Sequence, residues 1–143
     1  MTYEKPLKLR WSDLDPNMHI RHSVYYDFAA QVRTEFLFEN GLTTDMLAKH
    51  GLGPILFREE AVFKRELHFG DDLTINLLCR ALRRDASRFS FRHEIKRGDT
   101  TCAIINVDGA WIDTVERKLT APPELIYQAF DQVPRTKDFE WQD

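Results

Sequence analysis

The sequence predicts an α+β fold in which an antiparallel sheet of about five strands packs around one long helix. Three observations predict it: a strand-like alternation near the N-terminus, one broad helical stripe directly after it, and further alternating segments separated by turn residues. Both the apolar stripe of the helix and one face of the sheet must be buried, so we expect them to pack together. The 143 residues fit a single domain, with a core at about 5–131 and a C-terminal tail at 132–143.

The composition is that of an ordinary globular protein. Hydrophobic residues make up 43% of the chain and charged residues 30%, with a formal net charge of -3. Such a charge gives no overall basic field, so a nucleic-acid partner is not expected. No apolar run has the length of a signal peptide or the roughly 20 residues that span a bilayer. We therefore expect a cytoplasmic protein without a membrane partner.

The first expected element is a strand. Leu7, Leu9 and Trp11 alternate with polar residues, and Asp13 and Asp15 continue the phase of the apolar face. This period of two is typical of a half-buried strand, and the alternation ends at Pro16.

The second expected element is a helix of about 17 residues that begins at Ser23, a plausible N-cap. Asn40-Gly41 supplies its expected left-handed stop. Apolar residues recur at spacings of three and four along it, which predicts one buried stripe. This stripe consists of Val24, Tyr25, Phe28, Ala29, Val32, Phe36 and Leu37.

The rest of the chain predicts mainly strands. A short helical segment, TTDMLAKHG, precedes strands expected near 55–69, 73–81, 89–96 and 101–114, and Pro122-Pro123 opens a last short helix. Turn residues at 70–72, 84–85 and 98–99 are spaced for antiparallel hairpins. Such a sheet has exposed edges and leaves the helix partly uncovered, which favours a dimer that continues the sheet.

Two cysteines, Cys79 and Cys102, lie in apolar strand-like segments. Neither has a second ligand at a metal-site spacing, so buried free thiols are expected rather than a disulfide or a zinc site.

Four side chains that could carry protons or bind a metal gather between the strand and the helix: Asp13, Asp15, His19 and His22. The spacing Asp13, Asp15, Asn17 imitates a calcium loop, but Met18 occupies the position that requires glycine. A transition-metal site would lack any recognised ligand spacing, so no metal is expected.

A longer stretch carries a family resemblance. The run RWSDLDPNMHIRHSVYYDF, followed by RTEFL, resembles the N-terminal signature of the hotdog-fold acyl-CoA thioesterases, the group that includes hydroxybenzoyl-CoA thioesterase. Element order and length match this family from about residue 5 to 131. The resemblance implies a hotdog fold, thioester hydrolysis, and active sites at a subunit interface of a homodimer or homotetramer.

The resemblance also implies roles for individual residues. The second aspartate of the D-x-D pair corresponds to Asp15, which would act as nucleophile or general base, and both mechanisms stay open. Backbone N–H groups near His22 and Ser23 would form the oxyanion hole at the positive end of the helix. Without the resemblance, Asp15 would be interpreted as a residue that caps a turn. Asp13 is expected to form a structural ion pair with Arg10 or Arg33.

The chain departs from the family pattern at one place. Many members carry G-H-V-N-N where this chain has Met18-His19-Ile20-Arg21-His22, although other members also have a histidine at the position of His22. The substitution leaves the acyl-chain preference open.

Further residues are expected to bind the substrate, and they are His19, Tyr25, Pro54, Arg83, Arg84 and Arg88, with His22 also lining the site. The arginines flank a strand turn and would hold the coenzyme A phosphates, since guanidinium groups bind phosphate with paired hydrogen bonds. Pro54 lies in a segment, 51–56, that resembles the family's interface loop. No cofactor is expected, because the coenzyme A moiety belongs to the substrate.

The expected function is therefore acyl-CoA hydrolysis. A non-catalytic acyl-binding module, in which Asp15 only caps a turn, is the alternative from another class. Hydrolysis of acyl-carrier-protein thioesters is a second enzymatic alternative, which would favour a broader basic surface. A hydratase is less favoured, because no separate pair of Asp and His suits that chemistry.

Overall fold

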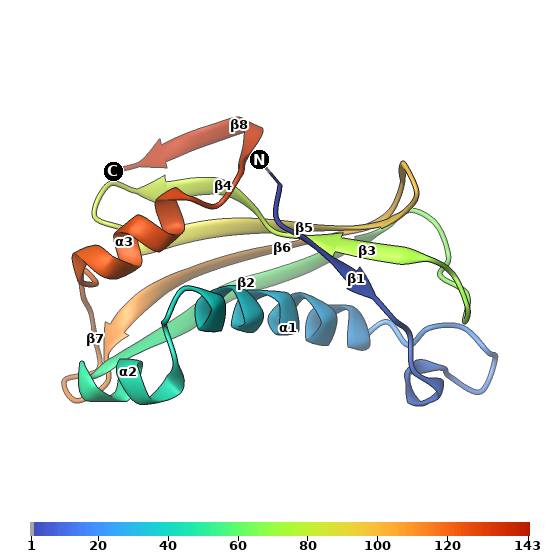
Figure 1. Ribbon diagram of the computed structural model, residues 1–143, viewed down its shortest axis with the longest axis horizontal. Coiled ribbons are helices and arrows are strands. Elements are labelled where there is room, and N and C mark those ends of the chain that lie inside the picture. The colour runs from blue at the N-terminus through green and yellow to red at the C-terminus, as the bar shows by residue number, and fades with distance from the viewer. Residues whose placement is uncertain (1) are drawn as a thin grey trace.

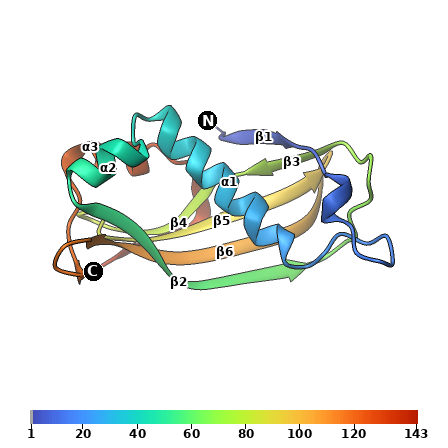
Figure 2. The ribbon, with the colours of Figure 1, turned by 90° about the horizontal axis from the view of Figure 1, so that it is seen from below.

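The computed structural model describes residues 2–143. The chain runs through elements in this order: β1 (Glu4–Leu7), a short 3-10 helix (Trp11–Asp13), α1 (Val24–Glu39), α2 (Thr44–Lys49), β2 (Leu52–Phe63), β3 (Leu73–Asn76), β4 (Leu78–Arg83), β5 (Arg88–Arg97), β6 (Thr100–Asp113), β7 (Lys118–Leu119), α3 (Glu124–Asp131) and β8 (Arg135–Gln142). The sheet curls over α1 (Figure 1), and α1 crosses its concave face with β2 along one edge (Figure 2). The predicted hotdog fold class is confirmed.

The pairing pattern is antiparallel except at the C-terminus. β6 lies between β2 and β5, and β5 pairs on its other side with both β3 and β4. β1 pairs with β3, whereas β8 pairs with β4 in parallel. β2 therefore forms one edge of the sheet, and β1 and β8 share the opposite edge.

The sheet has eight strands rather than the expected five. The strand expected at 73–81 is broken at Leu77, whose N–H group donates to Tyr3 O at 3.0 Å. β7 and β8 were not expected as strands; β8 lies within the segment interpreted as a C-terminal tail.

The expected strand through Trp11 is wrong. β1 ends at Leu7, and Trp11 is 81% exposed at the start of the 3-10 helix. The cause is Asp13, whose buried carboxylate accepts hydrogen bonds from the backbone N–H and the guanidinium of Arg10, both at 2.8 Å. These bonds fold the chain into a turn before the alternation can continue as a strand.

The long helix agrees closely with its sequence pattern. α1 spans 16 residues, and its predicted stripe is buried except for the half-buried Leu37. Gly41 adopts a φ of 78° just after the helix, as the left-handed stop requires. Cys79 and Cys102 are buried free thiols, as predicted.

Candidate active site

The loop before α1 is anchored by Asp13. Its carboxylate forms the expected ion pair with Arg10, and its backbone oxygen accepts a hydrogen bond from Arg21 N–H at 2.8 Å. Burial alone would raise the pKa of Asp13, but the hydrogen bonds from Arg10 outweigh this and hold the pKa below its ordinary value. Asp13 therefore joins both ends of the loop in its ionised form.

Asp15 organises the turn inside this loop. Its Oδ1 accepts hydrogen bonds from the backbone N–H groups of Asn17 and His19, both at 2.9 Å. The main chain of Asp15 also pairs with His19, with N–H to O at 2.7 Å. Oδ2 accepts no hydrogen bond from any residue within 2–143. One carboxylate oxygen is thus fixed by the turn, and the other is available to a substrate or water.

Met18 adopts a backbone conformation that usually requires glycine. Its φ is 64°, and its side chain is 67% exposed. This is the position at which many members of the resembling family carry glycine, which occupies left-handed conformations without a steric penalty. The turn that fixes Asp15 is therefore retained here at a cost in backbone strain.

We expect Met18→Gly to raise the free energy of unfolding by about 0.5–1 kcal/mol. The substitution removes left-handed backbone strain of roughly 1–2 kcal/mol from the folded state, and part of this gain is lost because glycine increases the conformational entropy of the unfolded chain. Thermal unfolding measures this. Asn17→Gly is the matched control. Asn17 lies next to Met18 and has no positive φ, so this variant should have a lower free energy of unfolding than the unmodified protein. Equal destabilisation of both variants would contradict the assignment of strain to Met18.

The N-terminus of α1 presents unpaired donors. The backbone N–H groups of His22 and Ser23 donate no hydrogen bond within residues 2–143, and the Ser23 side chain does not cap the helix. Val24 N–H bonds to Arg21 O at 3.2 Å. The helix dipole adds positive potential at this end, so the two N–H groups suit a developing negative charge.

A cleft of about 300 Å³ lies beside this helix start. His19, His22 and Tyr25 line it, so the structure brings three of the sequence-predicted residues together. Phe63 closes one side and packs edge-on against Tyr25 with ring centroids 4.9 Å apart. Asp15 is not among the lining residues; it contacts the cleft only through His19.

The three predicted arginines lie at the other end of the molecule. The β4–β5 turn that carries them is at the left end of the sheet in Figure 1, and the loop before α1 is at the right end. Arg88 pairs with Ala110 on β6, whereas Phe63 of the cleft pairs with Ala103, seven residues or roughly 23 Å along the same strand. Within one chain, the arginines do not meet Asp15.

The arginine turn nevertheless has a defined structure. The Arg84 guanidinium lies over the ring of Trp141, 4.7 Å from its centroid, and that of Arg88 lies 5.4 Å from the centroid of Phe57. Arg83 pairs with Gln142 of β8. Aromatic faces thus hold two of the three guanidinium groups at the surface.

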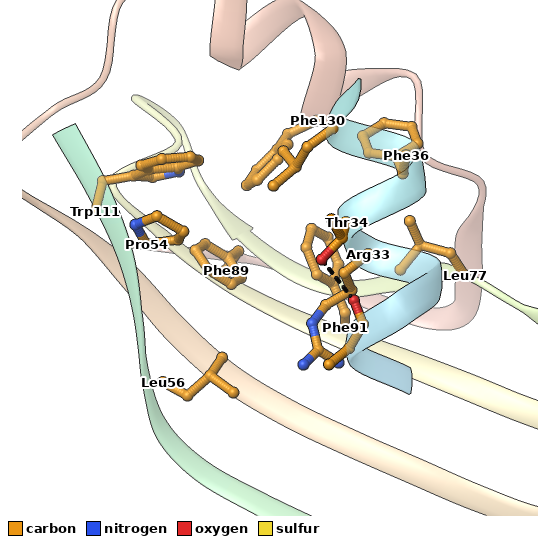
Figure 3. A pocket seen from close by; sticks show the side chains of 12 residues that line it. Arg33, Thr34, Phe36, Pro54, Leu56, Leu77, Phe89, Phe91, Trp111 and Phe130 are labelled. Carbon is orange, nitrogen blue, oxygen red and sulfur yellow. Dashed lines mark hydrogen bonds between the residues drawn. The ribbon is translucent and has the colours of Figure 1, made fainter. Parts of the chain in front are cut away.

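Pro54 lines a second cavity, between α1 and the sheet. This cavity has a volume of about 170 Å³ and a mostly aromatic and aliphatic lining (Figure 3). Its lining residues are Ala30, Arg33, Thr34, Phe36, Leu37, Pro54, Leu56, Leu77, Phe89, Phe91, Trp111 and Phe130. Sequence reasoning found only Pro54 among them, because the cavity is built from five elements far apart in the chain.

A contact beside this cavity, between the half-buried Arg33 and the buried His93, was also missed. Arg33 Nη1 lies 2.9 Å from His93 Nε2, and His93 Nδ1 lies 2.8 Å from Asn76 O. Burial and the neighbouring guanidinium lower the pKa of His93 to about 3, so the ring is neutral. The available signal was a histidine on the apolar face of an alternating strand. Its partner lies 60 residues away in sequence and could not be identified.

Among residues 2–143, no three His, Cys, Asp or Glu side chains come together as a set of metal ligands. No helix in the same range is long and apolar enough to cross a bilayer.

A family model matches most of this arrangement. The model of the thioesterase-like superfamily matches residues 9–130, which include the Asp15 loop, the helix and the sheet up to α3. The chain belongs to the thioesterase-like superfamily. The resemblance noted in the N-terminal motif is therefore confirmed at the level of the family.

Solved structures share the fold of this thioesterase-like chain. A hypothetical protein from Staphylococcus aureus in complex with CoA matches with a TM-score of 0.86 and 18% identity, covering 100% of this chain and 90% of that chain. A 1,4-dihydroxy-2-naphthoyl-CoA thioesterase from Synechocystis matches with a TM-score of 0.81 and 19% identity, covering 92% and 97%. A probable thioesterase from Bartonella henselae has a TM-score of 0.75 and 24% identity, covering 86% and 100%. At these identities the likeness establishes a common fold.

Proposed function

We propose that this protein is an acyl-CoA thioesterase in which Asp15 supplies the catalytic carboxylate. The observation that carries the proposal is that the loop before α1 holds a fixed carboxylate with one uncommitted oxygen and ends in the two unpaired N–H groups of His22 and Ser23. Thioester hydrolysis needs both parts: a carboxylate that attacks the carbonyl carbon or takes a proton from water, and donors for the oxyanion that forms. Membership of the thioesterase-like superfamily supports the same reaction class.

The reaction can be followed atom by atom. Asp15 Oδ2, or a water that it deprotonates, adds to the thioester carbonyl, and the carbonyl oxygen takes the negative charge between the two N–H groups. In the general-base route the C–S bond then breaks to give the free acid, and the coenzyme A thiolate takes up the proton that Asp15 removed from water. In the nucleophilic route the C–S bond breaks to leave a mixed anhydride on Asp15, and water then hydrolyses that anhydride, which releases the free acid and restores the Asp15 carboxylate. Either route uses no cofactor beyond the coenzyme A moiety of the substrate.

Coenzyme A as the leaving group is supported by a structural neighbour and by the arginine turn. The Staphylococcus aureus protein with the same fold was solved in complex with CoA. In this chain, Arg83, Arg84 and Arg88 offer guanidinium groups that suit the pyrophosphate and the 3'-phosphate. Since they lie far from Asp15 in one chain, their proposed role requires a second copy.

The edge strand β2 supports a homodimer. β2 pairs with β6 on one side only, and it carries exposed apolar side chains on a 12-residue strand. These side chains are Leu56, Phe57, Val62 and Phe63. If two copies pair β2 to β2 about a two-fold axis, opposite ends of the two molecules meet. The arginine turn and the Pro54 cavity of one copy then approach the Asp15 loop of the other.

We expect Val62→Lys to weaken this association, since a lysine on an edge strand opposes strand pairing. Sedimentation should show a dimer for the unmodified protein at micromolar concentration and a shift towards monomer for the variant, with acyl-CoA turnover falling in parallel. Val115→Lys is the control, because Val115 is 85% exposed in the turn after β6, beyond the first residue of β2 and at the opposite end of that strand from Val62. A wild-type protein that sediments as a monomer and still turns over substrate would refute the interfacial site.

A non-catalytic acyl-binding module is the second candidate, and one observation favours it. Asp15 Oδ1 already caps its own turn with two hydrogen bonds, and Asp15 does not line the cleft. Thiol release from a panel of short, long and aromatic acyl-CoAs separates the two candidates. Turnover that disappears in Asp15→Asn supports the thioesterase, whereas acyl-CoA binding without thiol release supports the module.

A further inference from the structure

The cavity beneath Pro54 contains one charged group. Arg33 is the only ionisable residue among the residues that line it, and its side chain extends from α1 towards the sheet beside Phe91 (Figure 3). An apolar cavity with a few polar groups is the usual construction of a small-molecule site, in which the polar groups orient the ligand. Neither the family match nor the proposed reaction gives this arginine a role.

The guanidinium of Arg33 is poorly compensated. Within residues 2–143 its one hydrogen bond runs from Nη1 to His93 Nε2, and no carboxylate oxygen lies within 4.0 Å of it. His93 is neutral and adds no negative charge. Burial lowers the pKa of Arg33, and the charge of Glu59 on β2 opposes this without direct contact. A half-buried cation with no negative charge in direct contact favours an anionic partner.

The unused donors are open to a ligand. A guanidinium has five N–H groups, so the bond to His93 leaves four. No nitrogen of Arg33 is among the fully buried side-chain atoms that lack a partner in the described chain, in contrast to Trp111 Nε1. Nε and Nη2 of Arg33, which have no partner in the described part of the chain, therefore reach accessible space, and their N–H groups suit a carboxylate held by two parallel hydrogen bonds.

The size of the cavity limits the rest of the ligand. Its volume of about 170 Å³ slightly exceeds the roughly 150 Å³ of an engineered protein cavity that binds benzene. Phe89, Phe91, Trp111 and Phe130 pack against one another with ring centroids 5.0 to 6.4 Å apart and form a continuous aromatic wall on one side of it. This lining suits one aromatic ring packed edge-on or offset.

We infer that the cavity binds a single-ring aromatic carboxylate, with the ring against the wall of four aromatic side chains and the carboxylate on Arg33. Arg33 lies ten residues from Ser23 along α1, about 15 Å from the helix start of the same chain. The carboxylate has two possible sources, a free acid such as the reaction product or the far end of an acyl group. Only the question of source rests on the proposed function, since binding can be measured without turnover.

Calorimetry with benzoate, and with benzyl alcohol as the uncharged ligand of the same size, tests the site. We expect benzoate to bind more tightly by about tenfold or more, and Arg33→Gln to abolish that preference while leaving benzyl alcohol unaffected. Arg117→Gln, in an exposed turn, is the matched control and should bind as the unmodified protein does. Absence of benzoate binding at millimolar concentration, or benzoate binding that is insensitive to Arg33→Gln, would overturn the inference.

A second variant guards against misfolding, because Arg33→Gln also removes the bond to His93. Ala30 is exposed and lines the cavity, so Ala30→Leu should keep the helix and the guanidinium while filling the space. Ala30→Leu should weaken the binding of both benzoate and benzyl alcohol, and unchanged affinity for both would again refute the site.

Kinetics with 4-carboxybenzoyl-CoA and 4-methylbenzoyl-CoA then identifies the source of the carboxylate. If Arg33→Gln raises KM for the carboxylated thioester alone, the group belongs to the acyl moiety. If the two KM values change equally while benzoate still binds through Arg33, the ligand is the free acid. A protein that binds benzoate through Arg33 but hydrolyses no thioester would refute the proposed function and support the benzoate site. A protein that hydrolyses thioesters but does not bind benzoate would support the proposed function and refute the benzoate site.

Discussion

Asp15→Asn should lower the turnover of acyl-CoA by about 10²- to 10⁴-fold and leave the fold intact. The amide keeps one oxygen, which can continue to accept the hydrogen bonds from the backbone N–H groups of Asn17 and His19. The other atom becomes an NH₂ group, which can neither attack a carbonyl carbon nor accept a proton from water. The substitution therefore separates the turn-capping role of Asp15 from its proposed chemical role.

The measurement is thiol release by both proteins under the same conditions, with thermal unfolding as the check on the fold. Asp27→Asn is the matched control, because Asp27 is an exposed carboxylate in the first turn of α1 that does not line the cleft. Its turnover should remain close to that of the unmodified protein. An Asp15→Asn protein within a few-fold of wild type would remove Asp15 from the mechanism.

Gly109→Ala should be the most destabilising single-methyl change in the sheet, with a loss of about 3 kcal/mol or more in the free energy of unfolding. A Cβ at Gly109 would lie 2.5 Å from Ile55 O and 2.6 Å from Phe89 Cζ. The carbonyl belongs to the backbone of the adjacent strand, just before the bulge between Leu56 and Arg58, so it cannot move without separating β2 from β6. Gly109 has no positive φ, so the effect is steric.

Gly53→Ala provides the comparison for this effect. Gly53 also lies on a β2–β6 pair, but a Cβ there would meet only side chains, that of Thr114 at 3.2 Å and that of Ile112 at 4.0 Å. Chemical denaturation of both variants should show a small decrease in the free energy of unfolding for Gly53→Ala and a large decrease for Gly109→Ala. Similar changes in the two variants would mean that the strands can separate locally at Gly109.

The elements that the sequence predicted well are those set by local patterns. The spacing of apolar residues between Val24 and Phe36 identified α1, and the turn residues at 84–85 and 98–99 identified the hairpins on either side of β5. In each case the signal and the structure it determines lie within a few residues of each other. The family motif then identified the candidate carboxylate and the helix start.

The features that the sequence did not predict depend on distant partners. β8 pairs with β4 in parallel, and its charged residues carry no strand pattern that reveals this. The Arg33–His93 contact joins a helix to a strand, and the Pro54 cavity joins five elements. The positions of Arg83, Arg84 and Arg88 relative to Asp15 likewise depend on the curl of the whole sheet and on the proposed second copy.

The two edges of the sheet differ in how readily they would accept another strand. β2 offers 12 residues with several exposed apolar side chains, whereas β1 has only four residues and includes Pro6, and half of β8 is charged. Short, proline-containing and charged strands resist further pairing. Association through β2 would therefore pair the one long apolar edge strand within residues 2–143, so assembly would stop at the dimer. The protein should remain dispersed at high concentration rather than polymerise into fibres, which light scattering can follow.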